Sequence, residues 1–331
     1  MRKEELKELP DVVQKYLTHQ SVILHKSQLT VLEYGSDLRS FLRYLMLESN
    51  SFNGDIPFSD ISVKNINTDL IYNAVADDVY DYINFCRNEK NNSENTRLRK
   101  FSSISTFYKW MAAHGYIENN PMENLERPKH KRSLPKYLTL EESVNLLEQI
   151  DGKNKERDYC IITFFLNCGL RLSELVSLNY NDIRDDRSMK VTGKGNKQRI
   201  VYLNDACISA YEQYMKVRPT EGIKPKDKNA LFLSQQRQRI SPKTVQHIVN
   251  TLFEKVGLGG QGLSTHKLRH TAATLLYQHS NTDVMLLKEL LGHESLATTE
   301  IYTHVVNEQL KNAVDSSPLN LIKLKTEESD K

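Results

Sequence analysis

The chain has 331 residues, 26% of them charged, and a formal net charge of +3. That length suits two domains with sizeable cores, whereas so small a net charge does not by itself indicate a nucleic-acid partner. The longest apolar run, over 160–166, is interrupted by Thr163 and is too short to span a bilayer. The charged first residues do not resemble a signal peptide, and the four cysteines form no Cys-x-x-Cys pair, so reduced thiols in the cytoplasm are expected.

The first third of the chain is predicted to be helical, from Val12 to Gly115. Apolar residues recur there at helical spacing, beginning with Leu29, Leu32, Leu38, Phe41, Leu42 and Leu45. Asn, Gly, Pro and Ser interrupt the pattern over 49–67, which we interpret as a loop, and further helices are predicted over 75–85 and 95–114.

The helix predicted over 95–114 has two different faces. One is an apolar stripe of Leu98, Phe101, Ile104, Phe107 and Trp110/Met111, and the other carries Arg97, Arg99, Lys100 and Lys109. A basic stripe of this kind is most often a solvated face, and contact with a DNA backbone is the alternative.

A linker is predicted over 119–138, where prolines prevent regular structure. It includes the basic run Pro128-Lys-His-Lys131-Arg132-Ser. This charge suits either a solubilising linker or a strap across a phosphate backbone.

Past the linker, Thr139 is predicted to begin a helix, with Glu142 three residues on as in a capping box. Two helices should follow, and Gly169 is expected to end the second one in the left-handed C′ conformation. The stretch over 187–203 changes to period two around Gly193, which predicts a β-hairpin before helices resume at Asp205.

Four short motifs in this second part carry the residue types of one active site. They are Cys168-Gly-Leu-Arg171-Leu-Ser-Glu174-Leu, Thr192-Gly-Lys194-Gly, His266-Lys-Leu-Arg269-His270, and Leu291-Gly-His293 followed by Ile301-Tyr302-Thr-His. Arginine binds phosphate, histidine and lysine move protons, and tyrosine supplies a nucleophilic hydroxyl. Such a set can cleave a phosphodiester without a metal.

Taken one by one, the motifs have ordinary structural explanations too. Arg171 and Glu174 could be a surface ion pair, and Lys194 could lie on a simple glycine turn, because the full P-loop pattern is missing. His266 and His270 have the spacing of a zinc pair, but the cation Lys267 between them disfavours a metal.

Together, the motifs closely resemble those of the tyrosine recombinase (phage integrase) family, most of all the Xer-type recombinases. The resemblance is strong from about Tyr137 to Val305 and extends in register over the N-terminal third. It implies a site-specific recombinase without a cofactor, with catalytic roles for Arg171, Lys194, His266, Arg269, His293 and Tyr302 and a supporting role for Glu174.

The resemblance also implies how the chemistry is divided. Tyr302 attacks the scissile phosphorus and forms a 3′-phosphotyrosyl link, with His266 as the candidate base. Lys194 protonates the leaving 5′ oxygen, and Lys197 is the competing candidate for that acid.

The family fold is mainly α-helical and closes on DNA as a C-shaped clamp. The resemblance implies a SAM-like helical core-binding domain over 12–125, a linker over 126–136, an α-rich catalytic domain with a small hairpin over 137–315, and a tail over 316–331. Expected DNA contacts are Arg97, Arg99, Lys100, Lys131, Arg132, Lys197, Arg199 and Lys243.

Members of this family work as tetramers on two DNA sites. A homotetramer, or a heterotetramer with a paralogous recombinase, is therefore expected on double-stranded DNA, away from membranes. The apolar residues Leu319, Leu321, Ile322 and Leu324 of the tail are expected to dock into a neighbouring subunit, with docking on their own subunit as the alternative.

Three other functions fit part of this pattern. They are a type IB topoisomerase, a DNA-binding accessory protein without catalysis, and a metal-dependent hydrolase built on His266 and His270. Within recombination, the motifs leave open whether the enzyme resolves chromosome dimers or moves a mobile element.

Overall fold

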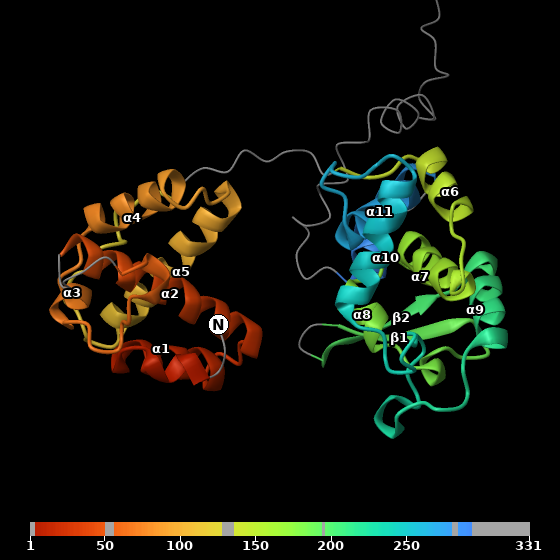
Figure 1. Ribbon diagram of the computed structural model, residues 1–331, viewed down its shortest axis with the longest axis horizontal. Coiled ribbons are helices and arrows are strands. Elements are labelled where there is room, and N and C mark those ends of the chain that lie inside the picture. Colours follow the sequence, from red (N-terminus) through yellow and green to blue (C-terminus); the bar gives the residue numbers. More distant parts are fainter. Residues whose placement is uncertain (1–3, 50–55, 128–135, 194–195, 280–283, 293–331) are drawn as a thin grey trace, which may run out of the picture. The chain divides into compact units, whose positions relative to one another are not determined.

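The computed structural model describes residues 4–49, 56–127, 136–193, 196–279 and 284–292. The chain forms two compact units, 1–132 and 133–331, which divide within the stretch expected to be the linker. The fold is mainly helical, with one two-stranded sheet among the described residues (Figure 1). No helix in those ranges is long and apolar enough to cross a membrane.

The first unit is built around two long helices. Its α-helices are α1 (Asp11–Val22), α2 (Gln28–Glu48), α3 (Asp69–Tyr72), α4 (Ala76–Asn88) and α5 (Glu94–Ala113). Helices α2 and α5 pack against each other, and each also contacts α1 and α4. Ser27 and Ser93 cap their N-termini by accepting hydrogen bonds from Thr30 N and Thr96 N.

The predicted stripe of α5 is buried in the core of this unit. Phe101, Ile104, Phe107 and Met111 are all inaccessible to solvent or nearly so. By contrast Leu29, which belongs to the apolar pattern predicted for α2, lies in the first turn of that helix and is 67% exposed. The described part of the predicted loop contains a single 3-10 turn at Phe58–Asp60.

The second unit wraps helices around a central one. Its helices are α6 (Leu140–Glu148), α7 (Lys155–Cys168), α8 (Leu172–Ser177), α9 (Asp205–Val217), α10 (Pro242–Lys255), α11 (Thr265–His279) and α12 (Val284–Leu291). Helix α7 contacts α6, α9 and α11, and α12 packs on α11 (Figure 1). The capping box is present, because Thr139 Oγ1 and the Glu142 carboxylate each accept from the other's backbone N–H.

The predicted hairpin is the sheet of this unit. Strands β1 (Ser188–Thr192) and β2 (Gln198–Tyr202) are antiparallel, with Val191 opposite Arg199. Val191 and Val201 are buried and Tyr202 is exposed, so one face of the sheet packs on the helices.

A candidate active site centred on Glu174

The turn between α7 and α8 brings the first motif into position. Gly169 ends α7 with φ 57° and ψ 36°, the left-handed conformation predicted for it. A Cβ at this position would also lie 2.7 Å from Leu291 Cδ2. Glycine is thus required both by the backbone and by the close approach of α12. Arg171 follows as the N-cap of α8.

Glu174 is the centre of the site. Its carboxylate is buried and accepts the backbone N–H of Arg171 at 2.9 Å and Arg171 Nη1 at 2.8 Å. Arg199 binds the same carboxylate through both Nη atoms, at 2.8 and 3.0 Å, and Arg269 Nη1 lies 3.8 Å from Oε2. Burial acts to raise the pKa of Glu174, but the hydrogen bonds and charges of Arg199 and Arg171 outweigh it and hold that pKa below the ordinary value.

The same three arginines cap the C-terminus of α12. Arg199 Nε donates to the carbonyl of Leu290 at 3.2 Å, Arg269 Nη2 to Leu291, and Arg171 Nη2 to Gly292 at 3.0 Å. The last carbonyls of a helix have no partner within the helix and carry a partial negative charge. Guanidinium groups satisfy them here, so Glu174 and the end of α12 share one set of cations.

Arg269 is held more tightly than its sequence motif suggests. Its guanidinium is 2% exposed and also donates to the carbonyl of Gly169 at 2.6 Å. In this structure both Nη atoms are committed to backbone oxygens. Arg269 therefore lies beneath the site, whereas the side chain of Arg171 is 35% exposed.

His266 and Arg171 line one recess at the surface of this cluster. The recess has a volume of about 340 Å³ and is lined by Leu170, Arg171, Leu172, Ser173, Pro242, Thr265 and His266. Desolvation by the surrounding protein, followed by the charges of Arg269, Lys267 and Arg171, lowers the pKa of His266 below 6.5. His266 is thus neutral at pH 7 and able to accept a proton.

His270 stacks edge-on against His266, with ring centroids 4.6 Å apart. It is half-buried, so it supports the ring of His266 from within helix α11. Among the described residues, no three His, Cys, Asp or Glu side chains are grouped as a metal site.

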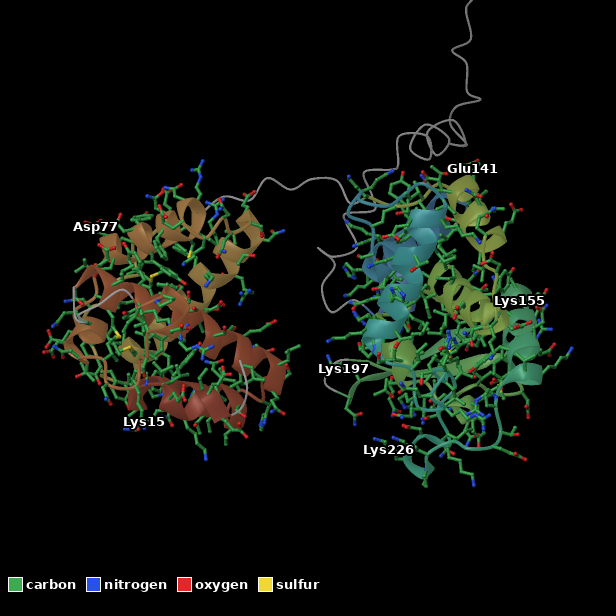
Figure 2. All side chains as sticks on the ribbon, viewed as in Figure 1. Lys15, Asp77, Glu141, Lys155, Lys197 and Lys226 are labelled. Atoms are coloured by element: carbon green, nitrogen blue, oxygen red, sulfur yellow. The ribbon has the colours of Figure 1, made fainter. Side chains whose placement is uncertain are left out.

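The hairpin turn reaches the same cluster. Gly193 N donates to the carbonyl of Lys197 at 2.7 Å, and a Cβ added to Gly193 would lie 3.3 Å from Glu174 Oε1. Lys197 is exposed, and Figure 2 labels it beside the hairpin turn. Lys194, His293 and Tyr302 lie outside the described residues, as does the tail over 316–331.

Two of the predicted DNA contacts have little exposed surface in this structure. Lys100 is 11% exposed and donates to Tyr82 Oη at 3.0 Å near the buried Asp37, and burial lowers its pKa. Arg199 is 14% exposed and faces Glu174. In each case a buried carboxylate provides the partner, Asp37 for Lys100 and Glu174 for Arg199.

The remaining predicted DNA contacts lie nearer the surface. Arg97 is half-buried, Arg99 is partly exposed while bound to Asp37, and Lys243 is exposed in the first turn of α10. Lys131 and Arg132 lie outside the described residues.

Comparison with known proteins agrees with this architecture. The model of the phage integrase family matches residues 136–309. The chain is 47% identical over 312 residues to tyrosine recombinase XerC of Caldanaerobacter subterraneus subsp. tengcongensis, covering 94% of this chain and 88% of that protein. It is 31% identical over 309 residues to tyrosine recombinase XerD of Rickettsia bellii, covering 89% and 94%.

Solved structures share the fold at lower identity. The XerH site-specific recombinase bound to palindromic difH substrate in a post-cleavage complex has a TM-score of 0.66 and 24% identity, over 92% of this chain and 83% of that one. The Tn1549 transposon integrase in complex with transposon right end DNA has a TM-score of 0.70 and 18% identity, over 93% and 99%.

These comparisons define the class of protein: an enzyme of the tyrosine site-specific recombinase type. The chain belongs to the phage integrase family, in which it is an Xer-like recombinase.

Proposed function

We propose that the protein binds a double-stranded DNA recombination site and exchanges strands there without a metal or organic cofactor. Tyr302 attacks the scissile phosphorus, the 5′ oxygen leaves, and a 3′-phosphotyrosyl link retains the energy of the broken bond. The 5′ hydroxyl of a partner strand then attacks this link and releases the tyrosine. Recombinases of the same fold have been solved with DNA substrates, which supports DNA as the partner.

The observation that carries this mechanism is the recess shared by Arg171 and His266. Arg171 is fixed by Glu174 on one edge and remains partly exposed, so its guanidinium is available to non-bridging phosphate oxygens. His266 is neutral and accepts the proton of the attacking Tyr302 hydroxyl. A cation and a base thus line the same recess before DNA arrives.

The buried arginines strengthen this recess electrostatically. Arg171, Arg199 and Arg269 surround a single carboxylate, so the cluster keeps an excess of positive charge. Preorganised positive charge of this kind stabilises the additional charge of the pentacoordinate phosphorus. Arg269 contributes to this charge from a buried position, where it donates to the carbonyls of Gly169 and Leu291.

Lys194 and His293 complete the site in this proposal. Gly193 approaches Glu174 and Gly292 binds Arg171, and these two glycines immediately precede Lys194 and His293 in the chain. We assign Lys194 as the acid that protonates the leaving 5′ oxygen, with Lys197 as the alternative. We assign His293 as a further donor to the phosphate.

For the whole molecule we propose a clamp made of the helical domain (12–125) and the catalytic domain (137–315), joined by the linker (126–136). Four subunits, identical or paired with a paralogue, would act on two sites in the cytoplasm, with the tail (316–331) docking between them. The 47% identity to a XerC protein favours chromosome dimer resolution over movement of a mobile element. The DNA that flanks the gene distinguishes the two functions: transposon genes beside it would indicate a mobile element, and their absence would favour chromosome dimer resolution.

The substitution Tyr302→Phe tests the proposed chemistry. It retains the ring and removes only the nucleophile, so DNA binding should persist and the covalent complex should be lost. The readout is a denaturing gel of protein incubated with a nicked recombination-site duplex. A covalent adduct that survives denaturation in the variant would contradict the assignment.

A further inference from the structure

A projecting loop of the second unit carries three exposed lysines. The loop spans residues 219–230, between α9 and α10, and we call it the lysine arm. Lys224, Lys226 and Lys228 alternate along it around one 3-10 turn (Pro225–Asp227), and all three are exposed. Figure 2 labels Lys226 where the arm projects from the body of the unit. None of these lysines is among the DNA contacts expected from the sequence, so the arm is a separate feature of the surface.

One buried arginine holds the two ends of the arm together. Arg218 Nη1 donates to the carbonyl of Pro219 at 3.3 Å, at the start of the arm. Its Nη2 donates to the carbonyls of Lys228 and Ala230 at 3.3 and 2.6 Å, and its Nε to that of Leu231 at 3.1 Å. The backbone that carries the lysines is thus fixed in advance, so a partner that binds them would immobilise mainly their side chains.

The exposed charge of this surface is mainly positive. Arg237 lies against the arm, because its Nη1 donates to the carbonyl of Glu221 at 2.9 Å. Asp227 is only 8% exposed. Among the residues that the structure describes, no carboxylate forms an ion pair with the three lysines, whereas Lys255 is paired with Asp151 at 2.7 Å. The exposed charged side chains of the arm and of Arg237 beside it are four cations and one carboxylate: Lys224, Lys226, Lys228, Arg237 and Glu221.

The arm ends beside α8, the helix that begins at the candidate active site. Arg171 caps the N-terminus of α8, whose six residues span about 9 Å. Three more residues lead to Tyr180, whose backbone N–H donates to the carbonyl of Asn229 at 3.1 Å. By this path the backbones of Arg171 and Lys228 are at most roughly 30 Å apart, which is less than one turn of B-DNA. A duplex with one phosphate at Arg171 therefore has other phosphates at the distance of the arm.

We propose that the lysine arm binds the phosphate backbone of duplex DNA within about one helical turn of the phosphate that is cleaved. This proposal rests on the proposed function, in which Arg171 holds the cleaved phosphate. Several lysines on one fixed backbone suit a polyanion, because a row of phosphates can bind more than one of them and release its counterions. Phosphate contacts carry no sequence information, so the arm strengthens binding to any DNA sequence.

The salt dependence of DNA binding tests this proposal. The probe is a fluorescent duplex of arbitrary sequence and about 30 base pairs, or roughly three helical turns. Lys224→Gln combined with Lys226→Gln removes two charges from the arm. The slope of log K against log salt concentration should become shallower by about 1 for each lysine, so by about 2 in this variant. At about 0.1 M salt the affinity should fall at least about ten-fold.

Two double variants are matched to this one. Lys153→Gln with Lys155→Gln also removes two exposed charges from the second unit, at the start of α7, and Figure 2 labels Lys155 away from Lys226. This control should keep the unsubstituted slope and bind within about two-fold of the unsubstituted affinity. Lys224→Arg with Lys226→Arg retains both charges, and arginine also binds phosphate, so it should keep the slope as well.

The possible outcomes separate this proposal from the proposed function. If the glutamine variant of the arm keeps the unsubstituted slope and affinity, the arm does not contact the DNA backbone and the proposal is overturned. The proposal also fails if the control variant loses as much as the glutamine variant, or if the arginine variant does. If the unsubstituted protein does not bind the duplex at all, the proposed function fails and this proposal fails with it.

Discussion

Arg269 donates a hydrogen bond to the carbonyl of Gly169 at 2.6 Å, although the two residues are 100 positions apart. The contact joins the end of α7 to α11, and the other Nη atom of Arg269 joins α11 to the end of α12. A residue predicted from its motif to bind phosphate thus also holds three helices together. A substitution of Arg269 should therefore lower both the free energy of unfolding and the rate of cleavage.

This dual role predicts different behaviour for two conservative substitutions. Arg269→Lys should lower the free energy of unfolding by about 2 kcal/mol, because one ammonium cannot satisfy both carbonyls in a buried position. Arg171→Lys should lower the free energy of unfolding by less than about 1 kcal/mol, because the side chain of Arg171 is 35% exposed. Both should reduce single-turnover cleavage much more than DNA binding. Urea unfolding measures the stability of the two variants, and cleavage of a nicked recombination site measures their activity. Equal losses of unfolding free energy in Arg269→Lys and Arg171→Lys would contradict the prediction.

Glu174 should make stability depend on acid pH. Its pKa in the folded protein lies below the unfolded value near 4.5, so its ionised form stabilises the fold above that pH. The stabilisation is lost as the pH falls through the folded pKa. Glu174→Gln should unfold more easily at pH 7 by about 3 kcal/mol, because three arginines lose their anion.

The comparison of the two proteins across pH isolates this contribution. The gap in unfolding free energy between the unsubstituted protein and Glu174→Gln should narrow as the pH falls below 4.5. A gap that stays constant down to pH 3 would mean that the carboxylate does not titrate as its surroundings indicate.

Local chemistry made much of the fold predictable. The left-handed Gly169, the Thr139 capping box, the stripe of α5 and the hairpin all depend on residues close together in sequence, and all were found. Leu29 shares the helical spacing of its neighbours but is 67% exposed, which periodicity alone does not reveal.

The network around Glu174 could not be predicted in the same way. Periodicity gave Arg171 and Glu174 a shared side, but it could not choose among the many cations that might pair with that carboxylate. One signal was present in the sequence: Arg199 alternates in phase with Val201 and so belongs to the buried face of its strand. A charged residue on a buried face predicts an internal partner, although not which one.

Gly169 offers a test of how closely α12 must approach. Gly169→Ala should lower the free energy of unfolding by about 1 kcal/mol because of the positive φ at this position. The close contact of the added Cβ with Leu291 should increase that loss. Gly257→Ala is the matched control, since Gly257 also has a positive φ of 74° but nothing within 4 Å of an added Cβ. Urea unfolding measures the loss of unfolding free energy in both variants. The amount by which the loss in Gly169→Ala exceeds that in Gly257→Ala reports how closely α12 packs against Gly169. Equal losses at the two sites would contradict that close packing.

His266 should set the acid limb of the cleavage reaction. As the base it must be neutral, and desolvation together with Arg269, Lys267 and Arg171 lowers its pKa below 6.5. The value of kcat/KM reports groups of the free enzyme, so it should fall at acid pH, and the midpoint of this fall should lie below pH 6.5. His266→Gln should be slower and should lose this limb. If the limb instead lies above pH 6.5, or persists unchanged in His266→Gln, another group accepts the proton of the tyrosine.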